Sequence, residues 1–424
     1  MAESHTYISS LSFSRKTNNA LNQFWAGFII YTTSYTLIIS GSISHKIVYL
    51  QLLGMVIFLM STIHLITFKI EDKYLRNIFL LYCGWQVYIV LRGFTFSTEN
   101  LFNTLTNSSS GIFLYLSPLI LLFPKNLIYL KKVIIVILIL SVFYIVFNIV
   151  FIKALLAADV ENGNTVLEYF SKLLGIPTGF ILITIIYHSD KRKLWAVIGK
   201  MWVLFIIVLT LLLAVIKARR GLMFMSLNLF LFSYIIYYHA NKRNLFSKFF
   251  PLFIIFFVFI YAISISGKQN LGAFDLISER LNEDSRSNVE EYFYLDMNKK
   301  DWIAGKGIEG YYYCPTGATE DGYRNIIETD YLQIILKGGF ISLGLLLLIA
   351  IPAIFMGFFY SKNILSKAAA AWILLFLIDS YPANVSTFSL NYLLVWISIG
   401  ICYSKEIRNL QEDTVKEYFQ YKLF

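Results

Sequence analysis

The sequence predicts an all-α polytopic membrane protein with about 12 transmembrane helices and one large extracytoplasmic loop between the ninth and tenth helices. The 424-residue chain is 57% hydrophobic and 15% charged, whereas a soluble protein carries about a quarter charged residues. Apolar runs of about 20 residues, which is the length that crosses a bilayer as a helix, recur along the chain. The only long polar stretch between such runs is residues 267–328.

The apolar runs place the expected helices in order. The chain divides into helices 1–9 (1–266), the extracytoplasmic loop (267–328), helices 10–12 (329–402) and a cytoplasmic tail (403–424). Residues 1–22 are polar, so we expect no cleavable signal peptide. We interpret the tail as solvated near the membrane, with an amphipathic surface helix as the alternative. The expected spans are 23–40, 47–68, 76–92, 109–123, 133–152, 171–187, 196–216, 221–238, 249–266, 329–358, 367–380 and 387–402.

The distribution of Lys and Arg sets the orientation. More than half of the 36 basic residues lie in the termini and in short loops on one side, and the short loops on the other side are nearly free of them except at 217–220. The positive-inside rule therefore places both termini in the cytoplasm and the long polar loop outside the cell membrane, in a multi-pass membrane protein. The net charge of +10 is explained by these loops, so we expect no nucleic acid partner.

The cysteines and histidines exclude two other classes of site. Cys83 and Cys402 lie in apolar runs, so Cys314 has no expected disulfide partner. No Cys/His spacing typical of a metal site occurs, and we expect neither a metal nor another cofactor.

The first motif that carries chemistry is Lys217-Ala218-Arg219-Arg220-Gly221, a short outer turn. Its three cations oppose the charge trend of that side. Guanidinium groups bind phosphate oxygens in a bidentate way, so the motif predicts a diphosphate clamp, with Arg220 the stronger candidate. The alternative is that these side chains reach lipid head groups, which makes membrane lipids a partner.

The second motif lies in the long loop, where Ser285-Arg286 precedes a Gly305-Lys306-Gly307 turn. Glycines at these positions allow a tight turn with exposed backbone amides. Arg286 also lies four residues before Glu290, so an ordinary helical ion pair is the alternative interpretation of that arginine.

The third motif is Glu328-Thr329-Asp330-Tyr331 at the start of the tenth span. Thr329 or Asp330 suits a helix N-terminus, where acidic side chains complement the helix dipole. Glu328 at the membrane surface is also a candidate general base for a hydroxyl nucleophile.

The three motifs occur in order with the twelve-span layout and with Gly338-Gly339-Phe340-Ile341-Ser342-Leu343-Gly344 in the tenth span. This combination resembles the O-antigen polymerase and O-antigen ligase superfamily of bacterial polysaccharide assembly. Ligases of that family carry His-Asn before the tenth helix, and Glu328-Thr329 stands there in this chain, which favours a Wzy-like polymerase.

The resemblance implies a metal-independent glycosyltransferase of the bacterial cytoplasmic (inner) membrane. It would polymerise undecaprenyl-diphosphate-linked repeat units of O-antigen, capsule or exopolysaccharide at the outer face of that membrane. The lipid-linked glycan would be both donor and acceptor, and a polysaccharide chain-length regulator is a further implied partner. The expected catalytic residues are Arg220, Arg286 and Glu328. The expected substrate-binding residues are Arg219, Lys306, Arg324, Asp330 and Tyr331.

Two alternative functions remain open at this point. A ligase would transfer the glycan to a different lipid or other acceptor with the same chemistry. A lipid-linked oligosaccharide flippase would transport the glycan without reaction, although transporters often show internal repeats and polar residues scattered within the spans. Here the intramembrane charges are few, with Lys200, Lys337 and Asp379 as the candidates.

Overall fold

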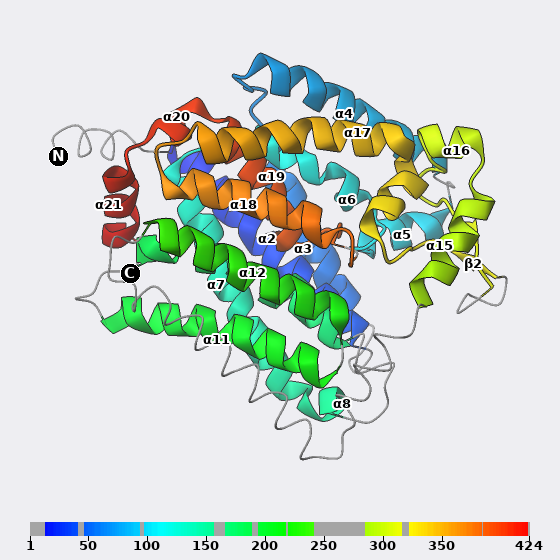
Figure 1. Cartoon of the computed structure of the whole chain (residues 1–424), viewed down its shortest axis with the longest axis horizontal. Coiled ribbons are helices and arrows are strands. Elements are labelled where there is room, and N and C mark those ends of the chain that lie inside the picture. The colour runs from blue at the N-terminus through cyan, green and yellow to red at the C-terminus, as the bar shows by residue number, and fades with distance from the viewer. Residues whose placement is uncertain are drawn as a thin grey trace.

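The chain folds into a bundle of helices with a small polar body at one end (Figure 1). The computed structural model describes residues 13–40, 46–93, 97–156, 166–188, 194–217, 219–240, 285–315, 322–383 and 385–422. Within these ranges the structure is helical apart from one two-stranded hairpin, which confirms the expected all-α class. The expected ninth span, 249–266, and residues 267–284 of the long loop lie outside the described residues.

Each of the other expected spans coincides with a helix or with a run of short helical segments. The fourth and sixth are interrupted, since 3-10 and π-helical turns follow or precede α-helix there. The first half of the chain forms α2 (Arg15–Ile39), α3 (Ile47–Leu65), α4 (Lys73–Gly93), α5 (Thr98–Thr106), α6 (Ile112–Leu116), η1 (Ser117–Leu122), α7 (Leu127–Val150), α8 (Ile152–Leu156), η2 (Ser171–Gly175), α10 (Thr178–Ile183), η3 (Ile185–His188), α11 (Leu194–Ile216) and α12 (Arg220–Ala240).

The second half of the described chain contains the polar body and the last helices. The hairpin pairs Tyr312 with Arg324 in antiparallel register. The elements are α15 (Ser285–Asp296), α16 (Lys299–Ala304), β1 (Tyr312–Tyr313), β2 (Tyr323–Arg324), α17 (Asp330–Phe359), α18 (Ile364–Asp379), α19 (Leu390–Tyr403), α20 (Lys405–Asn409) and α21 (Glu412–Lys422).

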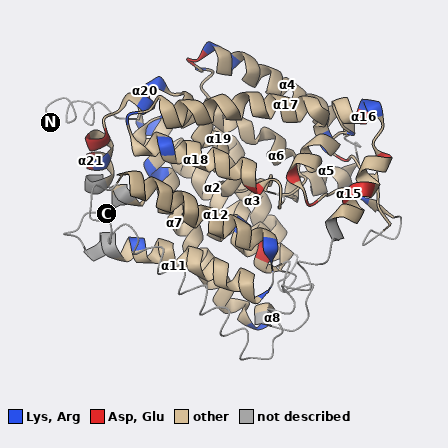
Figure 2. Cartoon of the chain, viewed as in Figure 1, with Lys and Arg blue, Asp and Glu red and all other residues tan. Residues whose placement is uncertain are grey.

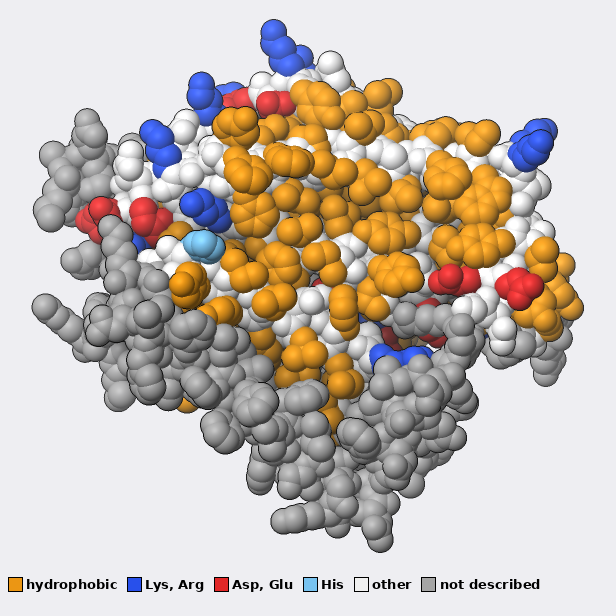
Figure 3. Space-filling model, in the orientation of Figure 1, with side chains coloured by type: hydrophobic (Ala, Val, Ile, Leu, Met, Phe, Trp, Pro, Cys, Tyr) orange, Lys and Arg blue, Asp and Glu red, His pale blue; other side chains and the backbone are white. Residues whose placement is uncertain are grey.

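Five described helices are long and apolar enough to cross a membrane: α3, α7, α11 from Ile198, α12 and α17. A broad belt of apolar side chains covers the middle of the visible face, and charged side chains lie toward its ends (Figure 3). Large exposed residues such as Leu231, Leu348 and Phe355 are typical of this surface. A soluble monomer rarely exposes so large an apolar area, so we interpret the belt as lipid-facing.

The loops group at two ends of the bundle, as the alternation of spans predicts. At one end, the Thr67 amide donates to the Leu122 carbonyl and the Asn363 side chain donates to Ile407. At the other, the Phe388 amide donates to Ser108, and Arg92 pairs with Asp301. Charged residues gather near both ends, whereas the middle of the helices is largely uncharged (Figure 2). We call α15, α16 and the β1–β2 hairpin the polar body, and we call the end of the bundle that carries them the polar-body end.

Helices α2 and α3 approach each other at backbone distance. A Cβ added to Gly27 would lie 2.6 Å from the Phe58 nitrogen, and one added to Gly54 would lie 2.7 Å from the Tyr31 nitrogen. Facing glycines are a common device by which helices pack closely in membranes, where van der Waals contact replaces the hydrophobic driving force.

Helix α17 is broken at Gly339, whose φ of 67° and ψ of −175° are not helical. A continuous helix of 30 residues would be about 45 Å long, which exceeds the roughly 30 Å hydrocarbon core. The break leaves residues 340–359 to match that thickness. Residues 330–338 then form a separate outer segment that packs on the polar body. The continuous apolar run predicted a single span over 329–358, and the division at Gly339 corrects that prediction.

The carbonyl groups that the break removes from the helix ladder are paired by neighbouring elements. The amides of Lys306 and Gly307 donate to the carbonyls of Leu336 and Lys337 at 2.7 and 2.9 Å. The Trp85 indole donates to the Gly338 carbonyl at 2.8 Å. The expectation that the Gly305–Gly307 turn exposes its amides is therefore wrong, because α17 accepts two of them.

The C-terminal tail is a helical element that packs against the bundle. In α21, Val415, Tyr418 and Phe419 are buried, at the i, i+3 and i+4 spacing of one helix face. The Phe419 ring contacts the Tyr187 ring at a centroid distance of 5.8 Å. The interpretation of the tail as a solvated segment is wrong, since an amphipathic helix places its apolar face on the protein.

Candidate functional site

The polar body has its own small core. Two of the predicted site residues, Arg324 and Lys306, belong to this body. Phe293, Tyr312, Cys314 and Leu336 are buried together. Burial raises the pKa of Tyr312 to about 12, partly opposed by the Arg324 guanidinium, and its hydroxyl donates to the Ile326 carbonyl. Arg324 is thus placed beside Tyr312 in the hairpin.

Lys306 lies in the same body and is held by the protein itself. Its ammonium group forms an ion pair with Asp296 and donates to the Tyr311 carbonyl at 3.1 Å. These partners tie the Gly305–Gly307 turn to the end of α15. Of the neighbouring tyrosines, Tyr312 is fully buried, whereas Tyr311 and Tyr313 are about half exposed.

A second group of predicted residues meets around the turn after α18, residues 380–386. An aromatic cluster holds the chain just after this turn. The Phe388 ring packs on Tyr31, Phe58 and Phe113 at centroid distances of 5.5, 5.8 and 5.3 Å. The Phe388 amide also donates to the Ser108 carbonyl at 2.7 Å. We call this turn, together with Asp330, Lys172, Arg219 and Arg220 beside it, the turn site.

Asp330 is fully buried at the centre of the turn site. Its Oδ2 accepts hydrogen bonds from the Ser386 hydroxyl at 2.6 Å, the Ser386 amide at 3.2 Å and the Ser380 hydroxyl at 3.4 Å. Its own amide donates to the Ser380 carbonyl. A buried carboxyl group needs such donors. Asp330 therefore fixes the start of α17 to the turn, and the Lys172 ammonium is a further electrostatic partner.

The predicted arginine motif lies beside the same turn, as a short connection between α11 and α12. A Cβ added to Gly221 would lie 3.2 Å from the Pro382 carbonyl and 3.3 Å from Ala383, so α12 begins against the turn. Arg220, half-buried, is the first residue of α12 and has no carboxylate partner within ion-pair distance in the described part of the chain.

Arg219 belongs to a chain of charged side chains, Lys172–Glu168–Arg219, of which only Arg219 was predicted as a site residue. Glu168 lies 2.6 Å from the Lys172 ammonium and 3.5 Å from Arg219. The Arg219 Nε is buried and has no hydrogen-bond partner among the described residues. Figure 2 shows basic and acidic segments meeting at this end of α12. Burial also lowers the pKa of Lys217 in the same connection.

A contact between α15 and the start of α17 joins Glu290 to the acidic motif, whereas the side chain of the loop arginine, Arg286, lies outside the described residues. The Thr329 hydroxyl donates to the Glu290 carboxylate, which lies one helical turn after Arg286 in α15. Thr329 is the N-cap residue, as expected, but its side chain makes no capping hydrogen bond because it is committed to Glu290. Glu328 is exposed beside it.

Two further predicted polar residues are used in helix packing near the turn. The Tyr331 hydroxyl donates to the Leu377 carbonyl. Asp379 accepts a hydrogen bond from the Asn228 side chain at 2.9 Å. Both contacts join α18 to its neighbours just before residues 380–386 begin.

The structure thus places Arg219, Arg220, Asp330 and Tyr331 on elements that meet around the turn after α18, with Glu328 adjacent in sequence, whereas Lys306 and Arg324 belong to the polar body. The charged residues missed were Lys172 and Glu168. Their signal was a Glu–Lys pair at i,i+4 spacing at the start of an apolar run.

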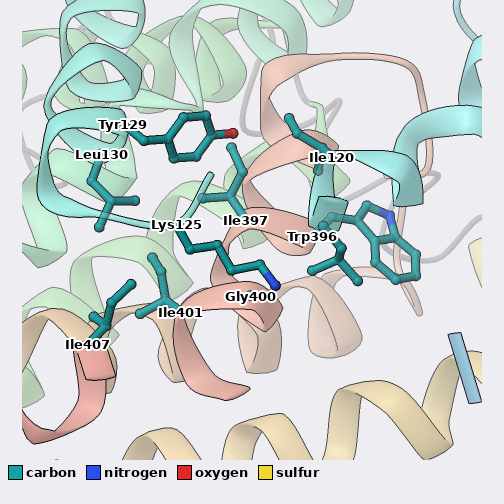
Figure 4. A pocket seen from close by; sticks show the side chains of 10 residues that line it. Ile120, Lys125, Tyr129, Leu130, Trp396, Ile397, Gly400, Ile401 and Ile407 are labelled. Carbon is teal, nitrogen blue, oxygen red and sulfur yellow. The ribbon is translucent and has the colours of Figure 1, made fainter. Parts of the chain in front are cut away.

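A cavity at the opposite end of the bundle is too small for a substrate. Lys125 extends over α19 toward Gly400, between Trp396 and Ile401 (Figure 4). The cavity has a volume of about 10 Å³, which is close to the space that one water molecule needs.

Fold and site together define a helical protein with an apolar belt and a charged site at the polar-body end. No family model, curated protein or solved structure matches this chain.

Proposed function

We propose that this protein is a membrane glycosyltransferase that polymerises undecaprenyl-diphosphate-linked oligosaccharide repeat units at the outer face of a bacterial cytoplasmic membrane. The observation that carries the proposal is the pair of adjacent arginines at the turn site. Arg219 has one long ion pair and an unpartnered buried Nε, and Arg220 pairs with no described carboxylate. Such guanidinium groups suit an anionic ligand with several oxygen atoms.

The proposed step is displacement at the anomeric carbon of the donor glycan. The bond between this carbon and the diphosphate oxygen breaks, and the oxygen keeps the electron pair. Arg219 and Arg220 stabilise the developing negative charge on the departing diphosphate, which is the largest electrostatic change in the reaction. Lys172 is paired with Glu168 and faces Asp330, so its charge mainly balances these two carboxylates and leaves the arginines to the ligand.

The acceptor hydroxyl forms the new bond to the anomeric carbon and loses its proton. We assign the proton to Glu328, whose exposed carboxylate lies at the start of α17. Asp330 is unsuited to this role because its carboxylate is buried and receives three hydrogen bonds from the turn. It acts as a positioning residue that holds the start of α17 against residues 380–386.

The proposal is tested with the purified protein in lipid nanodiscs and its cell's own lipid-diphosphate-linked repeat unit. The wild type should yield products of two or more units. Arg219→Ala and Arg220→Ala should each lower the rate by about 10²–10³, the usual effect of removing one group that stabilises a developing anion. Glu328→Gln should be similarly impaired. Lys405→Ala, an exposed cation on α20 at the other end, is the matched control and should retain wild-type activity.

The same assay separates the alternatives. A ligase would leave the repeat units unjoined and would form product only with a different acceptor. A transporter would form no new glycosidic bond in nanodiscs. Absence of longer products with the intact donor, or full activity of both arginine variants, would refute the proposed polymerase mechanism.

A further inference from the structure

We propose that a second cleft at the polar-body end, separate from the turn site, binds an uncharged stretch of oligosaccharide. The cleft has a volume of about 540 Å³ and lies between the ends of α2 and α3, helix α5, residues 308–311 and Asn325. This volume is within the range of small-molecule binding sites, about 300–1,000 Å³. We call it the amide cleft because of the side chains that line it.

Five of the lining side chains are amides that both donate and accept hydrogen bonds. A sugar hydroxyl also does both, so an amide can pair with it in either direction. A row of such groups suits a chain of hydroxyls better than it suits a hydrocarbon ligand. The five residues are Gln51, Asn100, Asn103, Asn107 and Asn325.

Aromatic side chains complete the lining in the manner expected of a carbohydrate site. Tyr311 and Phe102 line the cleft and are 49% and 45% exposed. An aromatic ring offers a flat apolar face, and a sugar ring presents C–H groups on one of its faces. Large exposed rings at a polar cleft are otherwise unfavourable, since they leave apolar surface in water.

The charge of the cleft distinguishes its ligand from that of the turn site. Among the described residues that line the amide cleft, none is Lys or Arg, and Glu309 is the one charged side chain. A phosphate or carboxylate would meet no cation there. The turn site contains Lys172, Arg219 and Arg220 beside Glu168 and Asp330. An anionic part of a substrate would therefore bind at the turn site, and a neutral part would bind in the amide cleft.

A buried polar atom in the lining supports a ligand directly. Gln51 is 1% exposed, and its Nε2 donates to the Thr106 carbonyl at 2.6 Å. Its Oε1 is buried and has no hydrogen-bond partner in the described part of the protein. An unpaired buried acceptor costs about 1–3 kcal/mol, which a hydroxyl donor from a ligand would recover.

Two contacts join the amide cleft to the turn site. The ring of Tyr35, which lines the cleft, contacts the Tyr169 ring at a centroid distance of 6.3 Å, and Tyr169 follows Glu168 of the charged chain. In addition, Ser108, beside cleft residue Asn107, accepts the Phe388 amide two residues after Ser386. The two places are thus joined through packed elements of the protein, and the identity of the bound glycan as the polymerase substrate rests on the proposed function.

The test measures binding and does not depend on catalysis. The probe is the repeat-unit oligosaccharide released by mild acid from the lipid-linked pool of the producing cell, which carries no diphosphate, tagged with a fluorophore at its reducing end. Wild type and Arg219→Ala should bind it equally in nanodiscs. Tyr311→Ala should weaken binding at least about tenfold, the effect of losing roughly 1.4 kcal/mol.

Tyr313→Ala is the matched control, because Tyr313 is 46% exposed two residues away and does not line the cleft. It should bind within twofold of wild type. Asn103→Trp, at an exposed position of α5, should block the cleft and abolish binding if Tyr311→Ala fails to fold. Inorganic diphosphate should not displace the probe.

Each outcome decides the proposal. No binding by the wild type, equal binding by Tyr311→Ala and Asn103→Trp, or displacement by diphosphate would overturn the neutral-glycan cleft. Binding that follows the prediction, in a protein that forms no polymer from the intact donor, would retain the cleft and remove the proposed polymerase function.

Discussion

Individual charged residues near the ends of the bundle are held by burial and by a few specific contacts. Lys125 shows this most simply. It precedes α7, and its side chain lies against Gly400, with Cε 3.3 Å from a Cβ placed there. Burial lowers the pKa of Lys125 to about 8, and Glu71 opposes part of that shift. Keeping Lys125 protonated in the folded protein near neutral pH therefore costs free energy of folding.

The sign of the pH dependence follows from the two states. Between pH 8 and 10.5 the unfolded chain keeps the Lys125 proton and the folded protein releases it, so stability rises with pH in this window. Lys125→Met should stabilise the protein at pH 7 by up to about 3 kcal/mol, at roughly 1.4 kcal/mol per pKa unit. The gain should vanish above pH 10.5.

Thermal unfolding in detergent between pH 7 and 11 measures this effect. Lys405→Met, an exposed lysine at the same end of the bundle, controls for the loss of one charge. A stabilisation by Lys125→Met that did not change with pH would show that apolar contact, and not the buried charge, is responsible.

Sequence reasoning located much of the turn site because its charges stand out at the ends of apolar runs. Arg219, Arg220 and Asp330 were predicted on that basis, and the structure gathers them around residues 380–386. The serines of that turn were missed, since Ser380 and Ser386 look like ordinary loop residues until Asp330 is placed against them. A hydrogen bond between residues 56 positions apart leaves no local pattern.

At the scale of elements, the break in α17 decides how the polar body is mounted on the bundle. Hydropathy is continuous across Gly338 and Gly339, so the sequence predicts one helix there. The backbone of Gly339 adopts a conformation that is essentially restricted to glycine. A Cβ on Gly339 would also overlap the Ile303 carbonyl at the end of α16. Conformation and close approach thus both require glycine.

Gly339→Ala should therefore prevent α16 from docking on α17. The strained backbone alone costs about 1–3 kcal/mol, and the overlap with Ile303 adds to it. We expect a loss of more than about 3 kcal/mol, measured as a lower midpoint of thermal unfolding or loss of the monodisperse peak in size-exclusion chromatography. Gly344→Ala is the control in the same helix, because its Cβ would meet nothing within 4 Å. Equal behaviour of the two variants would exclude the packing argument.

The Glu412 carboxylate of helix α21 stabilises the start of helix α18. Glu412 Oε2 accepts from the Ile364 amide at 2.8 Å and from the Tyr187 hydroxyl at 3.0 Å, and Tyr187 in turn accepts the Leu365 amide. The first amides of a helix have no partner within it, so these contacts complete the start of α18. This arrangement was not predicted, because the tail is distant in sequence from α18.

Glu412→Ala should destabilise the protein by about 1–3 kcal/mol, the cost of leaving the partly buried Ile364 amide and the Tyr187 hydroxyl without their acceptor. Asp413→Ala, at the exposed neighbouring position, should be within about 0.5 kcal/mol of wild type. The comparison is made by thermal unfolding in one detergent. Equal melting of Glu412→Ala and the wild type would mean that the tail docks through its apolar face alone.

At the scale of the whole molecule, the two ends of the bundle should face opposite sides of a membrane. Loops predicted on one side share contacts at one end, as Asn363 does with Ile407, and loops predicted on the other share contacts at the polar-body end, as Phe388 does with Ser108. The apolar belt lies between them (Figure 3). The excess of Lys and Arg in the loops near the tail then predicts that the polar body is outside the cell membrane.

Single cysteines at the two ends test this orientation in intact cells. Tyr313→Cys, on the exposed side of the hairpin, should react with a membrane-impermeant maleimide added outside. Asp413→Cys, exposed on α21, should react only after the cells are permeabilised. Both variants carry Cys83→Ala, because Cys314 and Cys402 are buried and Cys83 is partly accessible. Labelling of Asp413→Cys from outside, with Tyr313→Cys protected, would invert the topology and place the arginines of the turn site on the wrong side for an outward-facing lipid diphosphate.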